Sequence, residues 1–185
     1  CTSLESLNLD SFNTNEVVDM NSMFYACTSL TSLNLNHFNT NKVTNMSGMF
    51  GLCEKLTSLN LTPLNTQNVT DMSDMFYNCS GLTTLDLSPL DTQKVTNMSW
   101  MFYNCSGLTA LDLSLIDTSK VTNMNAMFKD CSTLTHLSLG EKFAFVGSEY
   151  NLPSGTWYSS DGTAYTSNGK SCTIPNNKAD TYTRR

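Results

Sequence analysis

Charge, histidine and long apolar runs are all scarce in this sequence. Only 14% of its 185 residues are charged, it has two histidines, and its ten lysines and arginines are scattered along a chain of net charge −6. We expect no nucleic-acid binding, because that function needs a clustered basic surface. No apolar run approaches the length of a membrane span, and the first residues, CTSLESLNLD, lack the features of a signal peptide. We therefore expect no membrane insertion.

What the sequence does contain is a repeat of 26 residues. All ten methionines lie in five copies of one motif, of which VTNMSWMFYNC at 95–105 is an example. A fixed period of this length is typical of proteins built from stacked repeats. Six of the seven cysteines follow the same period, at Cys1, Cys27, Cys53, Cys79, Cys105 and Cys131. Because Cys1 lies on this grid, we interpret it as an ordinary repeat cysteine and expect the chain to be part of a longer protein.

Each repeat combines a strand pattern with a helix pattern. The segment LTTLDL at 82–87 has the L-x-x-L-x-L spacing of leucine-rich repeats. Met98, Met101, Phe102 and Cys105 are spaced i, i+3, i+4, i+7, which places them on one face of a short helix. The fold class we predict is an α/β solenoid. It is a right-handed leucine-rich-repeat coil with one parallel strand and one short helix per repeat.

The sulfur-rich motif raises the question of a metal or redox site. Five identical copies without a histidine beside them do not supply converging ligands of a metal geometry. Buried packing is the better interpretation, because Met and Cys fill apolar interiors well. The grid cysteines leave two arrangements open, disulfides between neighbouring coils or a column of free thiols, and the frequent burial of free cysteine favours the column. We expect no metal and no cofactor.

The chain is predicted to have two parts. Residues 1–140 would form the leucine-rich repeat solenoid, with five full repeats and a partial sixth, and residues 141–185 would form a β-rich cap and tail. Within the tail, TWYSSDGTAYTS at 156–167 indicates a β-hairpin, with Asp161-Gly162 as its two-residue turn.

Two further expectations concern the tail. Residues 143–146 alternate imperfectly and suggest another strand. The last stretch, NNKADTYTRR, is expected to be loose, as chain ends often are.

Two surfaces are candidate binding sites. The first is the outward face of the strands, which in leucine-rich repeats usually binds partners; a solvated face of stacked amides without a ligand is the alternative. Its candidate residues are Asn34, Asn60, Thr84, Asp86, Asp112 and His136. The second is an exposed aromatic patch of Tyr77, Trp100 and Tyr103, residue types that often anchor contacts. Covering of gaps between helices is the alternative there, and we expect Gly51 and Lys129 to interrupt the tyrosine column.

Enzyme activity is not expected. Asp86 and Asp112 lie one repeat apart, at a spacing that would suit a pair of catalytic carboxylates. However, any residue stacked in a ladder shows this spacing, and no nucleophile, base and oxyanion group can be assembled from the sequence. No catalytic residue is therefore predicted.

The segment LTTLDLSPLDTQKVTNMSWMFYNC at 82–105 resembles the 26-residue repeat of bacterial surface proteins, a branch of the BspA-like leucine-rich repeats. The resemblance covers residues 1–140, and the tail is similar to segments that follow such arrays in surface proteins of gut bacteria. It implies an extracellular protein on the cell surface or cell wall of a bacterium. Members of this family typically act as adhesins.

The resemblance implies a non-enzymatic adhesion or recognition module that binds a host extracellular matrix protein or another cell-surface protein. Two alternatives stay open. One is a structural stalk that holds a different binding domain away from the cell, and the other is a carbohydrate-binding module that uses the aromatic patch to bind a glycan. The first coil, with Leu4, Leu7 and Leu9, is also expected to stack end to end on another copy.

Overall fold

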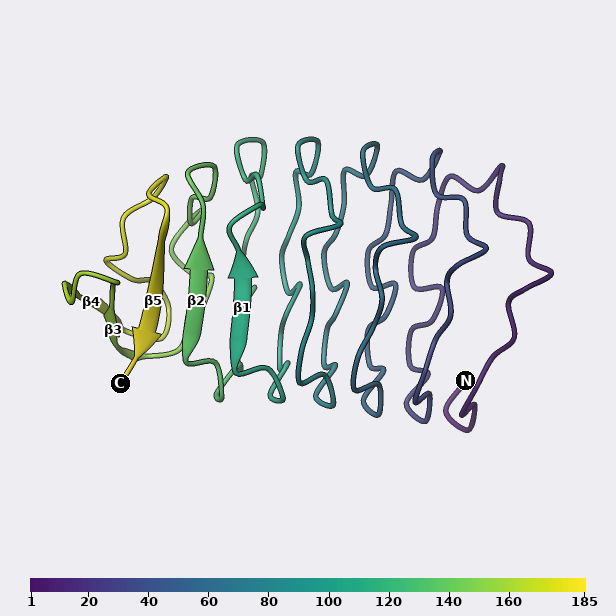
Figure 1. Ribbon diagram of the computed structural model, residues 1–185, viewed down its shortest axis with the longest axis horizontal. Helices are drawn as coiled ribbons and strands as arrows, with labels where there is room; N and C mark the ends of the chain where they lie inside the picture. Colours follow the sequence, from purple (N-terminus) through teal and green to yellow (C-terminus); the bar gives the residue numbers. More distant parts are fainter.

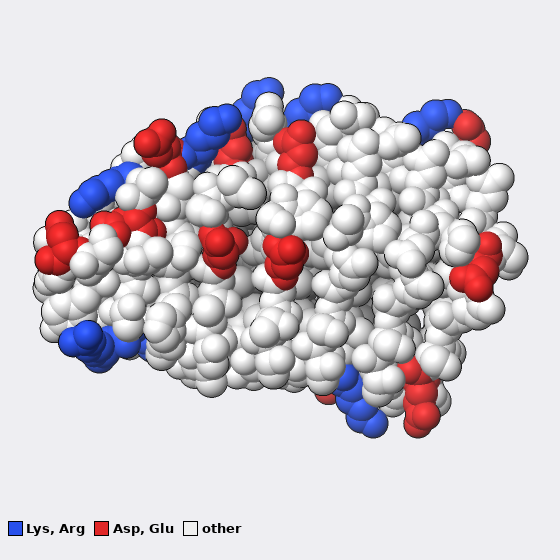
Figure 2. Space-filling model, in the orientation of Figure 1, with Lys and Arg blue, Asp and Glu red and all other residues white.

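The computed structural model describes all residues, 1–185, as a row of coils lying side by side, with the two termini at opposite ends (Figure 1). Equivalent residues of successive repeats lie next to one another. Asp19, Asn45, Asp71, Asn97 and Asn123 form an unbroken series of parallel β-bridges, each to the residue 26 positions further on. On the face shown in Figure 2, most of the surface carries no charge, and many of the visible lysine and arginine side chains lie along the upper edge.

The predicted α/β solenoid is wrong, because the structure contains no helix and only five short strands. They are β1 (Ala110–Leu113), β2 (His136–Leu139), β3 (Gly155–Tyr158), β4 (Ala164–Ser167) and β5 (Asp180–Arg184). All five belong to one small mixed sheet with the order β1-β2-β5-β3-β4. The sheet lies at the carboxyl-terminal end of the molecule (Figure 1), so most of the repeats have no strand.

The segment expected to be helical is a series of tight turns. The amide of Met101 bonds to the Met98 carbonyl at 3.4 Å, as in a β-turn, whereas the amide of Phe102 bonds to Met127 of the next coil at 3.0 Å. Trp100 and Asn104 have φ values of 60° and 49°. A helix cannot continue through left-handed residues four positions apart. We refer to this part of each coil, residues 98–105 in this repeat, as the turn side.

The turns nevertheless bury the residues that the helical spacing placed together. Met98, Met101, Phe102 and Cys105 are each at most 1% exposed. The packing interpretation of the sulfur-rich motif is therefore confirmed for these side chains, although the backbone that carries them is not helical.

Phenylalanines, threonines and cysteines each link the coils in their own column. The rings of Phe24, Phe50, Phe76, Phe102 and Phe128 stack with successive centroid distances of 6.0, 5.8, 5.8 and 6.2 Å. The buried hydroxyl of Thr66 donates to the Asp91 carbonyl and accepts the Asp91 amide, at 2.9 and 2.8 Å. Thr14, Thr40 and Thr92 make the same pair of bonds to their neighbouring coils.

The cysteine column consists of thiols in this structure. Cys53, Cys79, Cys105 and Cys131 each donate to a backbone carbonyl of the preceding coil, at 3.3, 3.1, 3.1 and 2.9 Å. Burial raises the pKa of Cys53 and Cys131 to about 12, because a thiolate is disfavoured away from water. Each thiol thus serves as a small apolar residue with one donor.

The opposite, leucine side of each coil, residues 82–87 in this repeat, is less tightly joined. A regular parallel ladder forms there only between β1 and β2, with Leu111 opposite Leu137. Between the coils at 57 and 83 a single backbone bond remains, from the Thr83 amide to the Thr57 carbonyl at 3.3 Å. The prediction of one strand per repeat is therefore wrong for the first four coils, although Leu82 and Leu87 are buried there.

The tail joins the last coil through β5, which pairs antiparallel with β2. The expected hairpin forms from β3 and β4 and places Trp157 opposite Tyr165. Its loop spans 159–163, so the predicted two-residue turn is wrong. The Ser159 amide donates to the Thr163 carbonyl at 3.0 Å and closes the loop.

The structure contains no helix that could span a membrane.

Two other expectations for the tail are also wrong. Residues 143–146 form no strand; instead the Phe145 ring packs edge-on against Phe128, with centroids 6.4 Å apart, at the end of the phenylalanine stack. The last residues are not loose, because β5 forms within them and buries Tyr182 to 1% exposure.

Candidate functional site

The residues predicted on the strand face are exposed, but most are used in local turns. Oδ1 of Asn34, Asn60, Asp86 and Asp112 accepts the backbone amide two positions further on, at 3.0, 3.0, 2.9 and 2.9 Å. Asn and Asp form such turns readily, because their side chains reach their own backbone. This column therefore shapes a corner of every coil.

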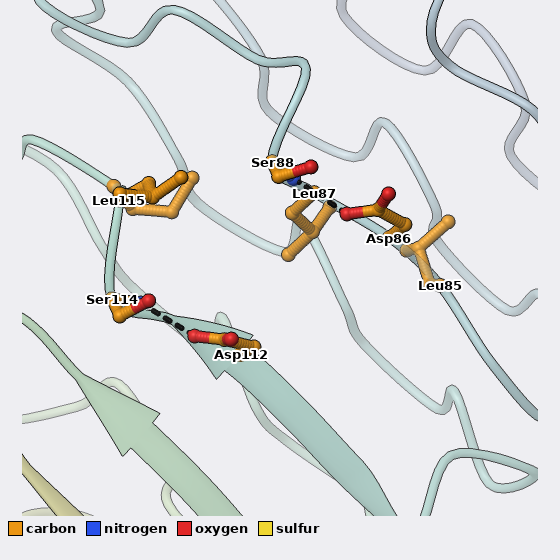
Figure 3. A pocket seen from close by; sticks show the side chains of 8 residues that line it. Leu85, Asp86, Leu87, Ser88, Asp112, Ser114 and Leu115 are labelled. Carbon is orange, nitrogen blue, oxygen red and sulfur yellow. Dashed lines mark hydrogen bonds between the residues drawn. The ribbon is translucent and has the colours of Figure 1, made fainter.

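Figure 3 shows a groove lined by both Asp86 and Asp112 and by Leu115, which is 68% exposed. Each carboxylate is held by the serine of its own coil, Ser88 or Ser114. Hydrogen bonds from the Ser88 side chain and backbone lower the pKa of Asp86. This is the opposite of what an acid catalyst requires.

Thr84 and His136 complete the predicted column, and the structure gives neither a specific role there. Both are exposed. His136 lies in β2, and its Nδ1 is 3.0 Å from the hydroxyl of the adjacent Thr135. The strand face thus offers small polar groups without a convergent site.

The three predicted aromatic residues do come together, on the turn side. Tyr77 and Tyr103 stack with centroids 4.9 Å apart and an interplanar angle of 8°. The Trp100 ring lies 5.0 Å from Tyr103 and 6.3 Å from Tyr77, tilted by 44° and 48°. All three rings are half-buried. We call these residues the aromatic cluster.

Trp100 adopts a backbone conformation that large side chains seldom take. Its φ is 60°, in the left-handed region, which costs about 1–2 kcal/mol for an L-residue. The equivalent positions in the other four coils hold small or short polar residues, namely Ser22, Gly48, Asp74 and Ala126. A residue so poorly suited to its backbone suggests a role other than folding.

Charged groups border the aromatic cluster. Lys129 Nζ lies 6.0 Å from the Trp100 ring and 5.7 Å from the Tyr103 ring, within the range of a cation–π interaction. A hydrogen bond with Asp130 and partial burial together raise the pKa of Tyr103. Lys129 interrupts the tyrosine column, as expected, but its ammonium group lies over the rings of the neighbouring coil.

Sequence reasoning missed Tyr25 as part of this surface. The Tyr25 ring extends over the next coil and covers Gly51, where an added Cβ would lie 2.7 Å from the ring. Burial, Tyr77 and Asp74 together raise the pKa of Tyr25. The gap that Gly51 leaves in the tyrosine column is therefore filled. A glycine at a repeat position otherwise held by tyrosine was the available signal.

The whole aromatic surface, which we call the aromatic strip, consists of Tyr25, Tyr77, Trp100 and Tyr103. It spans four successive coils on the turn side. Elsewhere, no group of three or more His, Cys, Asp or Glu side chains is placed to hold a metal ion.

Comparison with protein families assigns the chain to one of them. The family described as "Mycoplasma protein of unknown function, DUF285" matches residues 1–88 and 53–143, which together make up most of the chain. The chain therefore belongs to this family. No curated protein matches it.

One similar solved structure is that of a leucine rich cell surface protein from Faecalibacterium prausnitzii A2-165. The two are 20% identical, with a TM-score of 0.44, over 82% of this chain and 34% of that one. This chain therefore corresponds to about a third of that protein's length. The neighbour is a leucine-rich surface protein, the broad class that the sequence resembles; the BspA-like repeat branch stays a prediction.

Proposed function

We propose that this chain is a non-enzymatic recognition module that binds a protein partner through the aromatic strip. The observation that carries the proposal is the placement of Trp100, a bulky residue held in a left-handed conformation against Tyr77 and Tyr103. Half-exposed Trp and Tyr are the residues that most often dominate the energy of protein interfaces.

The strand face is the weaker candidate for this role. Its Asn and Asp oxygens already accept backbone amides, so a partner would have to compete with those bonds or use the remaining lone pairs. In the aromatic strip, by contrast, the charged group over the Trp100 and Tyr103 rings is the exposed ammonium of Lys129, which a partner can displace.

The sequence resemblance to BspA-like repeats supports an extracellular place on the bacterial cell surface or wall, and adhesion as the biological use of binding. A non-enzymatic role is supported by the turn role of Asp86, which accepts the Ser88 amide, and by the lowering of its pKa by hydrogen bonds with Ser88. In a stalk, by contrast, the surface residues would be interchangeable, and the unusual backbone of Trp100 would have no purpose.

Binding of the purified chain to bacterial and epithelial cell surfaces, measured by flow cytometry, tests the proposal. The double variant Trp100→Ala/Tyr103→Ala is expected to lose about thirtyfold or more in apparent affinity, since hot-spot residues contribute about 2 kcal/mol or more. The control Thr84→Ala/Asp86→Asn changes the strand face and should bind as the unmodified chain does.

Treating the cells with protease beforehand shows whether the partner is a protein. Binding that disappears after this treatment supports the proposal, and binding that survives it contradicts a protein partner. Unchanged binding by the Trp100→Ala/Tyr103→Ala variant would exclude the aromatic strip and favour the stalk.

A further inference from the structure

We propose that the aromatic strip takes a basic peptide segment, with an arginine or lysine side chain of the partner over Trp100 and Tyr103. This inference rests on the proposed function and names the chemistry of the bound segment. It follows from what already occupies the rings, from the charges around them and from the shape that Trp100 gives them.

The rings already hold a cation of this chain. Lys129 Nζ lies near both Trp100 and Tyr103, yet Lys129 is exposed and forms none of the five ion pairs of the structure. An exposed cation–π contact contributes only about two- to fivefold to an equilibrium constant. A partner's cation can therefore replace Lys129 with little loss, and a guanidinium group is better suited, because it is planar and stacks on aromatic faces.

Carboxylates flank the strip without basic partners. Asp130 lies near Tyr103 at one end, and Asp74 lies near Tyr25 toward the other. Neither carboxylate takes part in an ion pair. Burial and the nearby Asp71 raise the pKa of Asp74, so its charge is poorly compensated. The strip thus combines aromatic faces with uncompensated negative charge, which complements a positively charged segment.

Two residues in left-handed conformation, Trp100 and Asp130 of the next coil, contribute to this arrangement. The Trp100 ring lies against Tyr77 and Tyr103 from a backbone position with a φ of 60°. Asp130 occupies another left-handed position, with a φ of 62°, which Asp tolerates better than most residues. The turn geometry therefore places aromatic and acidic groups side by side on the same surface.

Intrinsic fluorescence provides a direct readout. Of the two tryptophans, Trp157 is fully buried, so a ligand that contacts the strip changes the emission of Trp100. The probe is a peptide of alternating arginine and glycine, titrated at low and high salt, with a glutamate–glycine peptide as the control. We expect the arginine peptide to bind more weakly at high salt and the glutamate peptide not to bind, because exposed charges are screened by salt.

Three variants separate this inference from other accounts. Peptide binding to each variant is measured by thermal stabilisation, and also by fluorescence where Trp100 is present. Trp100→Ala/Tyr103→Ala should abolish peptide binding. Asp130→Asn should weaken it about two- to fivefold, a loss in the range expected for one exposed ionic contact. Lys129→Ala should strengthen it by a similar factor, because it removes both a competing cation and a like charge.

The effect of Lys129→Ala is decisive. If that variant binds the peptide no better than the unmodified chain does, Lys129 is not a competitor and the inference is wrong. Fluorescence changes with neutral oligosaccharides but not with the arginine peptide would also overturn it and would indicate a glycan ligand. Loss of cell binding by Trp100→Ala/Tyr103→Ala, with no peptide binding by the unmodified chain, would refute the basic ligand while leaving the proposed function intact.

Discussion

The turn side and the leucine side of each coil are joined in different ways. On the turn side, the amides of Met72, Asp74, Phe76 and Asn78 all bond to carbonyls of the next coil, at 3.0, 2.9, 3.0 and 2.7 Å. On the leucine side of the same repeat, only Thr83 bonds to a neighbouring coil, and a regular ladder appears only at β1 and β2.

This difference explains where the chain is able to vary. On the turn side the backbone supplies the links between coils, and the left-handed residues at positions 22, 48, 74, 100 and 126 differ from coil to coil. On the leucine side the outward Asn and Asp residues form the turns themselves and hardly vary. A surface that recognises a partner is therefore expected on the turn side.

The largest effect on stability is expected from the phenylalanine stack behind the turns. Phe76→Ala removes a fully buried ring between Phe50 and Phe102, and should reduce the free energy of unfolding by about 3–5 kcal/mol. Phe12→Ala is the control, because Phe12 is 49% exposed. Chemical denaturation measures both; a loss below 1 kcal/mol for Phe76→Ala would show that the stack is not a packed core.

The threonine column should matter next. Thr66→Val keeps the shape of the side chain but leaves the amide and carbonyl of Asp91 without the Thr66 hydroxyl. Buried groups left without a partner cost about 1–3 kcal/mol. Thr84→Val, at an exposed position, should have little effect, and equal losses for the two variants would contradict the role of Thr66.

The cysteine column predicts a loss of stability at high pH. The pKa values of Cys53 and Cys131 rise in the folded state from 9.0 to about 12. The unfolded chain therefore releases these protons first, and stability is lost as the pH rises from 9 to 12. Thermal denaturation at increasing pH, compared with a Cys53→Ala/Cys131→Ala variant, measures this. A variant with the same pH dependence as the unmodified chain would contradict the prediction.

The smallest effect on stability is expected at Trp100, although its effect on binding should be large. Trp100→Gly relieves about 1–2 kcal/mol of backbone strain and loses ring contacts worth about 0.5–1.5 kcal/mol. The free energy of unfolding should therefore change by about 1 kcal/mol or less, while cell binding falls. A variant that unfolds easily would show that Trp100 is a structural residue.

Sequence reasoning identified which residues face the interior better than it identified the backbone. The i, i+3, i+4, i+7 spacing of Met98, Met101, Phe102 and Cys105 fits a helix, but a series of tight turns buries the same residues. Only the left-handed residues distinguish the two, and Trp100 and Asn104 give little sign of that conformation in the sequence. The hydrogen bonds between coils also cannot be seen in one repeat considered alone.

The candidate site was predictable in part. The repeat register placed Tyr77 and Tyr103 in one column, and the structure stacks them. The position of Tyr25 over Gly51 was not predicted, because it depends on a side chain extending into the space of the next coil. The contact of Lys129 with the rings was not predicted for a related reason, since a long flexible side chain can cover rings from a neighbouring position.

Hydrogen exchange of individual amides, measured by NMR, tests most directly the claim that the turn side holds the coils together. The amides of Phe76 and Asn78, which bond to the next coil, should exchange about 100-fold or more slowly than those of Leu85 and Leu87, which have no backbone partner. Equal rates on the two sides, or slower exchange at Leu85 and Leu87, would contradict the account.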